Sequence, residues 1–87
     1  MSSLPPLTLY GTLACHLCDA ALQVLQPLLA DGLQVQEVDI SEDAQLLERY
    51  QLRIPVLRRM DTGAELDFPF DLPALMDWLA VCLQEGA

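Results

Sequence analysis

The sequence predicts an α/β fold in which a four-stranded mixed sheet is flanked by three helices, in the order β-α-β-α-β-β-α. Two observations carry this prediction. In the first half, short apolar runs alternate with helical patterns, which is typical of parallel strands joined by right-handed crossovers. In the second half, two apolar runs are separated only by Asp61-Thr62-Gly63, which predicts an antiparallel hairpin. The 87 residues are enough for a single domain with one small core, and we expect residues 1–6 to be a flexible terminus.

The first half of the chain begins with a short apolar run at residues 7–10, which we interpret as a central strand. A helix follows and ends at Asp31-Gly32, where glycine suits a left-handed C-terminal position. Its apolar residues recur with helical spacing and predict a core-facing stripe: Leu17, Ala21, Val24, Leu25, Leu28 and Leu29. Residues 35–40 form a second predicted strand. Ser41 is a good N-cap residue, so we expect the second helix over residues 42–50.

The second half begins with a predicted third strand over residues 54–60, which opens with a proline. The hairpin loop leads to a fourth strand over residues 64–68. Asp71 is the expected cap of the last helix. A second apolar stripe predicts the inner face of that helix, with Trp78 and Cys82 on its flank and with these members: Leu72, Leu75, Met76, Leu79 and Leu83.

The charge of the chain argues against several classes of partner. Thirteen acidic residues stand against 4 basic ones, which gives a net charge of -9. Because phosphate binding needs a basic surface, we expect no nucleic acid partner, and an anionic membrane is disfavoured as well. The N-terminus has no basic or apolar signal region, and no apolar stretch is long enough to span a membrane. We therefore expect a soluble, cytoplasmic protein.

The motif with the clearest chemistry is Cys15-His16-Leu17-Cys18, which lies between the first strand and the first helix. Two cysteines at positions i and i+3 of a first helical turn face the same way. The free N–H groups and the positive dipole end of the helix stabilise a thiolate there. This strand-turn-CxxC-helix order is typical of a redox-active dithiol.

A structural zinc site is the alternative use of these cysteines. Such a site needs four ligands, and the chain offers three cysteines and one histidine, which lies between two of the cysteines. Three cysteines also cannot form a disulfide framework, so the pair is expected to be catalytic in a reducing compartment. We expect Cys82 to fill the core, with a regulatory thiol as the alternative.

The element order, the CxxC at the first strand-helix junction and the proline that opens the third strand resemble the glutaredoxin-like branch of the thioredoxin superfamily. The segments at residues 9–18, 37–40 and 53–57 are most similar to the small bacterial glutaredoxin-like proteins, whose substrates are largely undefined. The resemblance implies a thioredoxin-like fold, with Cys15 as nucleophile and Cys18 as resolving cysteine. It also implies that Pro55 is a cis proline beside the dithiol and that the backbone of Ile54 pairs with a substrate.

The chain departs from ordinary glutaredoxins at the glutathione-binding positions. It has no basic residue shortly before Cys15, and it has no glycine pair before the last helix. The places of Thr12, Arg53 and Asp71 in the resemblance nevertheless make them candidate substrate-binding residues, and Arg49 is a further candidate to hold a peptide carboxylate.

Two features near the motif modify these expectations. His16 either stabilises the Cys15 thiolate or simply tunes the dithiol. Phe68 and Phe70 would make the rim of the site apolar, which favours an extended peptide over glutathione.

The residues and the resemblance together predict a thiol-disulfide oxidoreductase that reduces protein or mixed disulfides. Two other readings stay open. One is a binding module that keeps the fold without catalysis, and the other is an iron-sulfur or metal carrier that uses Cys15. We expect no tightly bound cofactor or metal, with glutathione as a candidate reductant. The expected partner is a protein disulfide or glutathione, and the chain is expected to be a monomer, with a weak dimer as the alternative.

Overall fold

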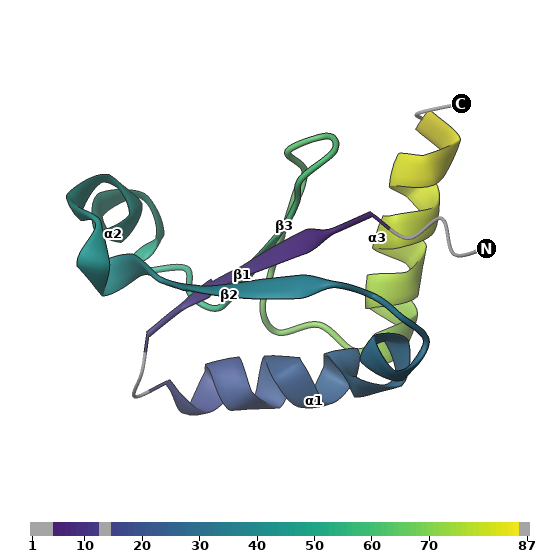
Figure 1. Ribbon diagram of the computed structural model, residues 1–87, viewed down its shortest axis with the longest axis horizontal. Helices are drawn as coiled ribbons and strands as arrows, with labels where there is room; N and C mark the ends of the chain where they lie inside the picture. The colour runs from purple at the N-terminus through teal and green to yellow at the C-terminus, as the bar shows by residue number, and fades with distance from the viewer. Residues whose placement is uncertain (1–4, 13–14, 86–87) are drawn as a thin grey trace.

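The computed structural model describes residues 5–12 and 15–85, with side chains up to residue 80. Its element order confirms the predicted β-α-β-α-β-β-α arrangement, with one 3₁₀ turn, η1, added before α2. The elements are β1 (Leu7–Gly11), α1 (His16–Ala30), β2 (Val35–Asp39), η1 (Ile40–Glu42), α2 (Ala44–Tyr50), β3 (Val56–Arg59), β4 (Glu65–Asp67) and α3 (Leu72–Glu85) (Figure 1).

The strands form one four-stranded mixed sheet in the order β2-β1-β3-β4. β1 lies parallel to β2 and antiparallel to β3, and β4 returns antiparallel to β3. At the carboxyl end of β1, Gly11 is in register with Asp39 of β2, and Tyr10 is in register with Val56 of β3. These pairs fix which residues surround the loop that leads from β1 to the dithiol.

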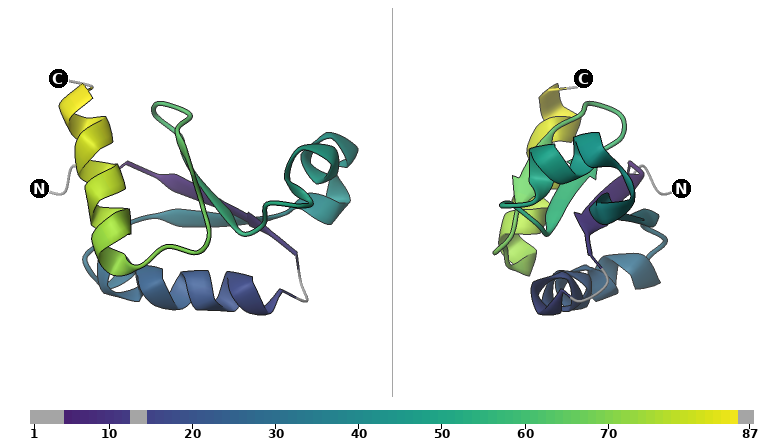
Figure 2. Two further views of the ribbon diagram at one scale, coloured as in Figure 1. Left: turned by 180° about the vertical axis from the view of Figure 1, so that it is seen from behind. Right: turned by 90° about the vertical axis from the view of Figure 1, so that its left-hand side faces the viewer.

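The two faces of the sheet carry separate apolar clusters. Helices α1 and α3 cover one face, and α2 lies at the end of the other, as the two views of Figure 2 show. The larger cluster joins β1, α1, β3 and α3, and its buried members are Leu7, Leu9, Ala21, Leu25, Leu28, Leu33, Leu57, Phe70, Leu75 and Leu79. The smaller cluster consists of Tyr10, Ile40, Tyr50 and Val56.

The apolar stripes predicted for α1 and α3 are correct for their buried members but wrong for their exposed members. Leu17 is 55% exposed and Met76 is 47% exposed, although both were expected to face the core. Consecutive helical residues point about 100° apart, so the burial of Cys18 turns its neighbour Leu17 outward. In α3 the buried positions are Leu75 and Leu79. The side chains of Leu83 and Cys82 lie outside the described residues.

The start of the second helix differs from the prediction. Ser41 is not its cap, because Asp39 accepts hydrogen bonds from the Ser41 N–H at 2.9 Å and from its hydroxyl at 2.6 Å. These bonds hold Ser41 within η1. Asp43 caps α2 instead, accepting from the N–H groups of Gln45 at 2.8 Å and Leu46 at 3.3 Å. The predicted start of the second helix was therefore wrong, because Asp43, two positions after Ser41, is also a good capping residue and caps α2.

The hairpin and the last helix follow the sequence closely. Gly63 has φ +79° and supplies the left-handed turn between β3 and β4. Asp71 caps α3 as predicted, accepting from the Ala74 N–H at 2.9 Å. Arg59 is almost completely buried. It donates to the Leu79 carbonyl at 2.9 Å and pairs with Asp61 at 2.6 Å, so it ties the hairpin to α3.

Candidate active site

The two cysteines of the CxxC motif lie at the start of α1. Cys15 is the N-cap residue with an extended backbone, and Cys18 is in the first turn. Their sulfur atoms are joined in a disulfide, with the Cα atoms 5.2 Å apart. The Cys18 N–H donates to the Cys15 sulfur at 3.1 Å. In the reduced protein such a donor stabilises a thiolate on Cys15 more than on Cys18.

The two sulfur atoms differ in their surroundings. Cys15 is half-buried, whereas Cys18 is only 7% exposed and belongs to the interior. The Cys18 sulfur packs against Gly11 so closely that a Cβ atom on that glycine would lie 2.5 Å from it. Cys15 is therefore the more accessible of the two cysteines, and Gly11 leaves the space that Cys18 occupies.

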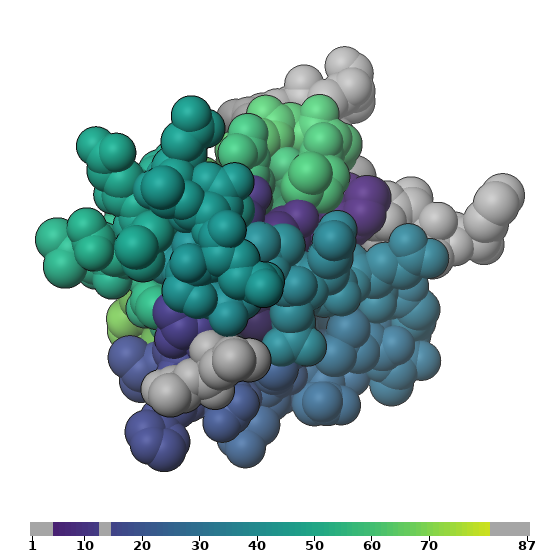
Figure 3. Space-filling view, turned by 60° about the vertical axis from the view of Figure 1, so that its left-hand side comes forward, coloured from purple at the N-terminus to yellow at the C-terminus, as the bar shows by residue number. Residues whose placement is uncertain are grey.

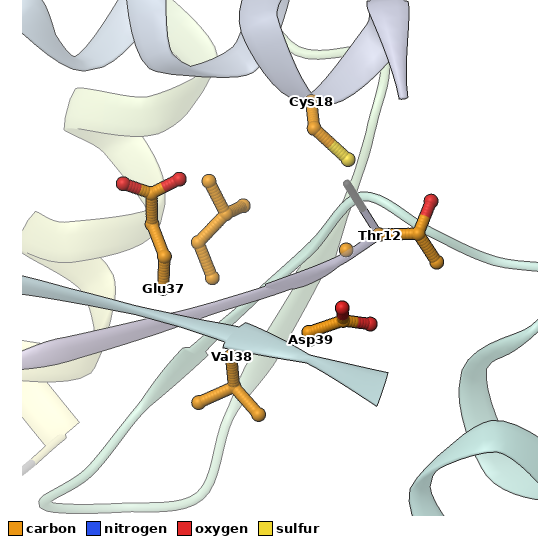
Figure 4. Close-up of a pocket in the computed structure, with 7 residues that line it drawn as sticks. Thr12, Cys18, Glu37, Val38 and Asp39 are labelled. Carbon is orange, nitrogen blue, oxygen red and sulfur yellow. The ribbon is translucent and has the colours of Figure 1, made fainter. Parts of the chain in front are cut away.

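A pocket of about 170 Å³ opens beside the Cys18 sulfur. It lies between the carboxyl ends of β1 and β2 and the first turn of α1 (Figure 4). Its polar lining comes from Thr12, Glu37 and Asp39. Hydrogen bonds from the hydroxyl and the N–H of Ser41 hold the pKa of Asp39 below its usual range, so this carboxyl is ionised at neutral pH.

Pro55 lies on the other side of β1. Tyr10 pairs with Val56, the first residue of β3, in an antiparallel ladder. Continuing this register by one residue places Pro55, which directly precedes β3, across from Gly11. The Ile54–Pro55 peptide bond is cis, and Pro55 is buried. The Ile54 N–H donates to the Tyr50 carbonyl at 3.0 Å. A substrate would gain that N–H only by displacing this bond.

These groups lie on one end of the molecule. Figure 3 shows α2, the end of β1 and the first turn of α1 on the same face, in teal, purple and dark blue.

The two arginines near this end of the molecule, Arg49 and Arg53, form ion pairs with acidic residues of β4. Arg53 pairs with Asp67 at 2.7 Å and with Glu65 at 2.9 Å, and Arg49 approaches Glu65 at 3.7 Å. Tyr50 also donates to Glu65 and stacks on Tyr10 with ring centroids 4.4 Å apart. The expected role of Arg53 in holding a peptide carboxylate thus competes with two carboxylates of the chain itself.

These contacts also shift the ionisation of the two β4 carboxyls. Burial disfavours the charged form of Glu65, but hydrogen bonds from Tyr50 and Arg53 and the nearby arginine charges outweigh it and lower the pKa. The Arg53 hydrogen bonds lower the pKa of Asp67.

The other candidate residues from the sequence lie at positions that do not indicate a particular role in the site. His16 is exposed on α1, and Thr12 is half-buried in the pocket lining. Asp71 is exposed, and its carboxylate is used as the α3 cap. The expected apolar rim is wrong for Phe70, which is 8% exposed and belongs to the core, with Phe68 packed against it. Both rings therefore contribute to the larger apolar cluster.

The sequence reasoning missed the acidic pocket. Glu37 and Asp39 alternate along β2, which predicts that both side chains point to one face. Because β1 and β2 are parallel, their carboxyl ends lie at the same edge of the sheet. Glu37 and Asp39 are therefore expected near the dithiol that follows β1. The alternation was therefore a usable signal. The second cis bond, Phe68–Pro69, had no such signal.

Two other kinds of feature are absent from the described part of the chain. There, no group of three or more His, Cys, Asp or Glu residues is arranged to hold a metal ion. No helix among the described residues is long and apolar enough to cross a membrane.

The chain is similar to known proteins over most of its length. The family model described as Glutaredoxin-like domain (DUF836) matches residues 6–80. The X-ray structure of the structural genomics target protein XcR50 from X. campestris is 47% identical, with a TM-score of 0.76 over 86% of this chain and 96% of that chain. The solution structure of protein Ne2328 from Nitrosomonas europaea is 25% identical, with a TM-score of 0.77 over 91% of this chain and 95% of that one.

Proposed function

The chain belongs to the glutaredoxin-like (DUF836) family of the thioredoxin superfamily, and we propose that it is a thiol-disulfide oxidoreductase that uses Cys15 as nucleophile and Cys18 as resolving cysteine. The single observation that carries the proposal is the pairing of Cys15 with Cys18 at the start of α1, with one sulfur accessible and the other buried.

The reaction consists of two thiol-disulfide exchanges. The Cys15 thiolate attacks one sulfur of a substrate disulfide, the substrate S–S bond breaks, and the departing thiolate takes up a proton. Cys18 then loses its proton and attacks the Cys15 sulfur, which releases the second substrate thiolate. The substrate gains two electrons, and the protein is left with the Cys15–Cys18 disulfide. Two molecules of an external thiol, with glutathione as a candidate, or one dithiol restore the reduced pair and are themselves oxidised to a disulfide.

Each part of the site contributes to one of these steps. The Cys18 N–H, 3.1 Å from the Cys15 sulfur, stabilises the attacking thiolate. The half-buried position of Cys15 leaves it accessible to a substrate sulfur. The i, i+3 spacing keeps Cys18 within bonding distance, so resolution needs no large movement of the backbone.

The preferred substrate in this proposal is a disulfide of a polypeptide rather than a glutathione mixed disulfide. Glutathione carries carboxylates, and the arginine best placed to receive one, Arg53, already holds Glu65 and Asp67. A net charge of -9 further disfavours an anionic tripeptide.

The proposal is tested by turnover. The protein is mixed with a protein disulfide and with dithiothreitol as electron donor, and disulfide reduction is followed above the rate of dithiothreitol alone. Cys15→Ser is expected to abolish the catalysed rate. Cys82→Ser, the same change at the third cysteine, is expected to leave it unchanged. The proposal fails if the wild-type chain does not accelerate reduction or if Cys15→Ser retains the full rate.

A further inference from the structure

The pocket beside Cys18 reaches the dithiol from the side away from Pro55. Across β1, Gly11 has Asp39 of β2 on one side and the start of β3 on the other. The pocket is lined by residues of β1, β2 and α1, and among the described residues neither Ile54 nor Pro55 lines it. Cys18 therefore lines a pocket that opens toward β2, whereas Ile54 and Pro55 precede β3 on the other side of β1.

Asp39 is the charged residue level with that sulfur. A Cβ atom added to Gly11 would lie 2.5 Å from the Cys18 sulfur, so Gly11 is directly beside that sulfur. Asp39 is in register with Gly11, and neighbouring strands lie about 4.8 Å apart with paired side chains on one face. Figure 4 shows the Asp39 carboxylate and the Cys18 sulfur near the end of β1, beside Thr12. Glu37, in register with Leu9, lines the same pocket two residues further away.

The charge of Asp39 is not neutralised by an arginine. Every ion pair among the described residues involves Glu65, Asp67 or Asp61. Within the part of the chain that the structure describes, Asp39 accepts only from the N–H and hydroxyl of Ser41, which keep it ionised without adding positive charge. The pocket therefore presents a fixed negative charge to Cys18.

We infer that Asp39 is a positioning residue for the dithiol: its carboxylate disfavours a thiolate on Cys18 and so directs the reactive thiolate to Cys15. The inference rests on the proposed function. A nearby like charge disfavours ionisation, and burial of Cys18 acts in the same direction. Cys15, by contrast, receives the Cys18 N–H and is more exposed. The two thiols thus differ in ionisation because Cys18 is buried and lines the pocket with Asp39, whereas Cys15 is more exposed and accepts the Cys18 N–H.

The charge of Asp39 affects the second step of the reaction, in which Cys18 resolves the mixed disulfide. After substrate attack, Cys15 carries a mixed disulfide and Cys18 is a thiol. Cys18 must release its proton to water before its thiolate bonds to the Cys15 sulfur. The bond between Cys15 and the substrate sulfur then breaks, and the substrate thiolate leaves with the electron pair and takes up a proton. By opposing the first event, Asp39 lengthens the lifetime of the mixed disulfide.

Other titratable groups near Cys18 are few among the described residues. None of the β1 residues in the pocket lining carries a charge. The groups to be followed alongside Asp39 are Cys15, His16 and Asp19 on α1 and Glu37 on β2.

The direct test is the ionisation of each thiol in the reduced protein, followed by the Cβ chemical shifts of Cys15 and Cys18 against pH. Asp39→Asn removes the charge and keeps an oxygen that accepts from Ser41. We expect the midpoint of Cys18 ionisation to fall by about one pH unit, with a smaller change at Cys15. Asp43→Asn makes the same change at the α2 cap, which does not line the pocket, and should move neither midpoint.

A kinetic measurement supplies the second readout. With Ellman's reagent, one thionitrobenzoate is released when Cys15 is modified and a second when Cys18 resolves the mixed disulfide. Lowering the Cys18 midpoint by one unit gives tenfold more thiolate at pH 7, but the thiolate is about threefold less nucleophilic. The second phase of Asp39→Asn should therefore be about threefold faster than that of wild type, with the first phase little changed.

The outcomes separate this inference from the proposed function. An unchanged Cys18 midpoint overturns the inference, and so does a slower second phase, which would make Asp39 a proton acceptor. If Asp39→Asn does not fold, Glu37→Gln must give a smaller downward shift of the Cys18 midpoint, and no shift overturns the inference. If wild type releases no second thionitrobenzoate, the proposed function fails, while the midpoints still test Asp39.

Discussion

Gly11 is the residue whose small size the dithiol depends on most directly. Any side chain there would place its Cβ atom 2.5 Å from the Cys18 sulfur, well inside contact distance. Unlike the turn glycines, Gly11 is not in the left-handed region. It is therefore required for space and not for backbone conformation.

Gly11→Ala is expected to push the first turn of α1 away from β1 and to change the equilibrium between the dithiol and the disulfide. The measurement is the reduction potential of the Cys15–Cys18 pair in a thiol redox buffer. We expect a shift of roughly 30 mV, a tenfold change in the equilibrium constant.

Gly32→Ala is the matched control for Gly11→Ala. Gly32 has φ +102° and nothing within 4 Å of an added Cβ, so this change costs stability through backbone strain alone. It should leave the reduction potential unchanged. Equal potentials for the two variants would contradict the assigned role of Gly11.

The contacts between α2 and β4 are held by charges and hydrogen bonds. Arg53 follows α2 and binds Glu65 and Asp67, while Tyr50 at the end of α2 donates to Glu65. Both carboxyls have a pKa below their ordinary values of 4.5 and 3.8. A lowered pKa in the folded state contributes stability above the ordinary value, and this contribution is lost as the pH falls through the folded-state pKa.

Arg53→Ala is therefore expected to lower the free energy of unfolding at pH 7 by roughly 0.5–1 kcal/mol, because solvent screens this partly exposed network. The difference from wild type should be smaller at pH 3, because that pH lies below the ordinary values of both carboxyls and the contribution of their lowered pKa is declining there. Denaturant unfolding at the two pH values measures both quantities. Arg49→Ala is the control, since Arg49 lies 3.7 Å from Glu65 with a 58% exposed side chain, and it should have the smaller effect at pH 7. A loss that is equal at both pH values would contradict this account.

At this scale the sequence predicts elements well where one local signal dominates. The apolar run of β1, the CxxC start of α1 and the glycine turn of the hairpin each had a single interpretation. The start of α2 was mispredicted because Ser41 and Asp43 are both good caps and only the contact with Asp39 decides between them. The partners of Arg53 were not predictable, since they depend on how β4 returns beside α2.

Across the whole molecule, positive charge is concentrated on one part of the surface and largely neutralised there. All basic residues lie between positions 49 and 59, and the ion pairs of the described residues join three of them to carboxylates of β4 and its hairpin. The pocket acids Glu37 and Asp39 have no such partner among the described residues. An anionic substrate therefore meets net negative charge at the dithiol.

We expect a peptide disulfide to be reduced faster than a glutathionylated form of the same peptide. The two rates are measured side by side, for wild type and for Arg53→Ala. A preference of tenfold or more for the glutathionylated peptide, about 1.4 kcal/mol of barrier, that disappears in Arg53→Ala would show that Arg53 binds glutathione despite its partners in the chain.

The central claim, that Cys15 attacks and Cys18 resolves, is tested most directly by trapping the intermediate. Cys18→Ser is incubated with a peptide disulfide, and the adduct is mapped by mass spectrometry. The account predicts a stable mixed disulfide on Cys15 in this variant, a far slower reaction in Cys15→Ser, and an intramolecular Cys15–Cys18 bond with Cys82 free in wild type. An adduct on Cys82, or one that forms on Cys18 of Cys15→Ser as fast as on Cys15, would contradict it.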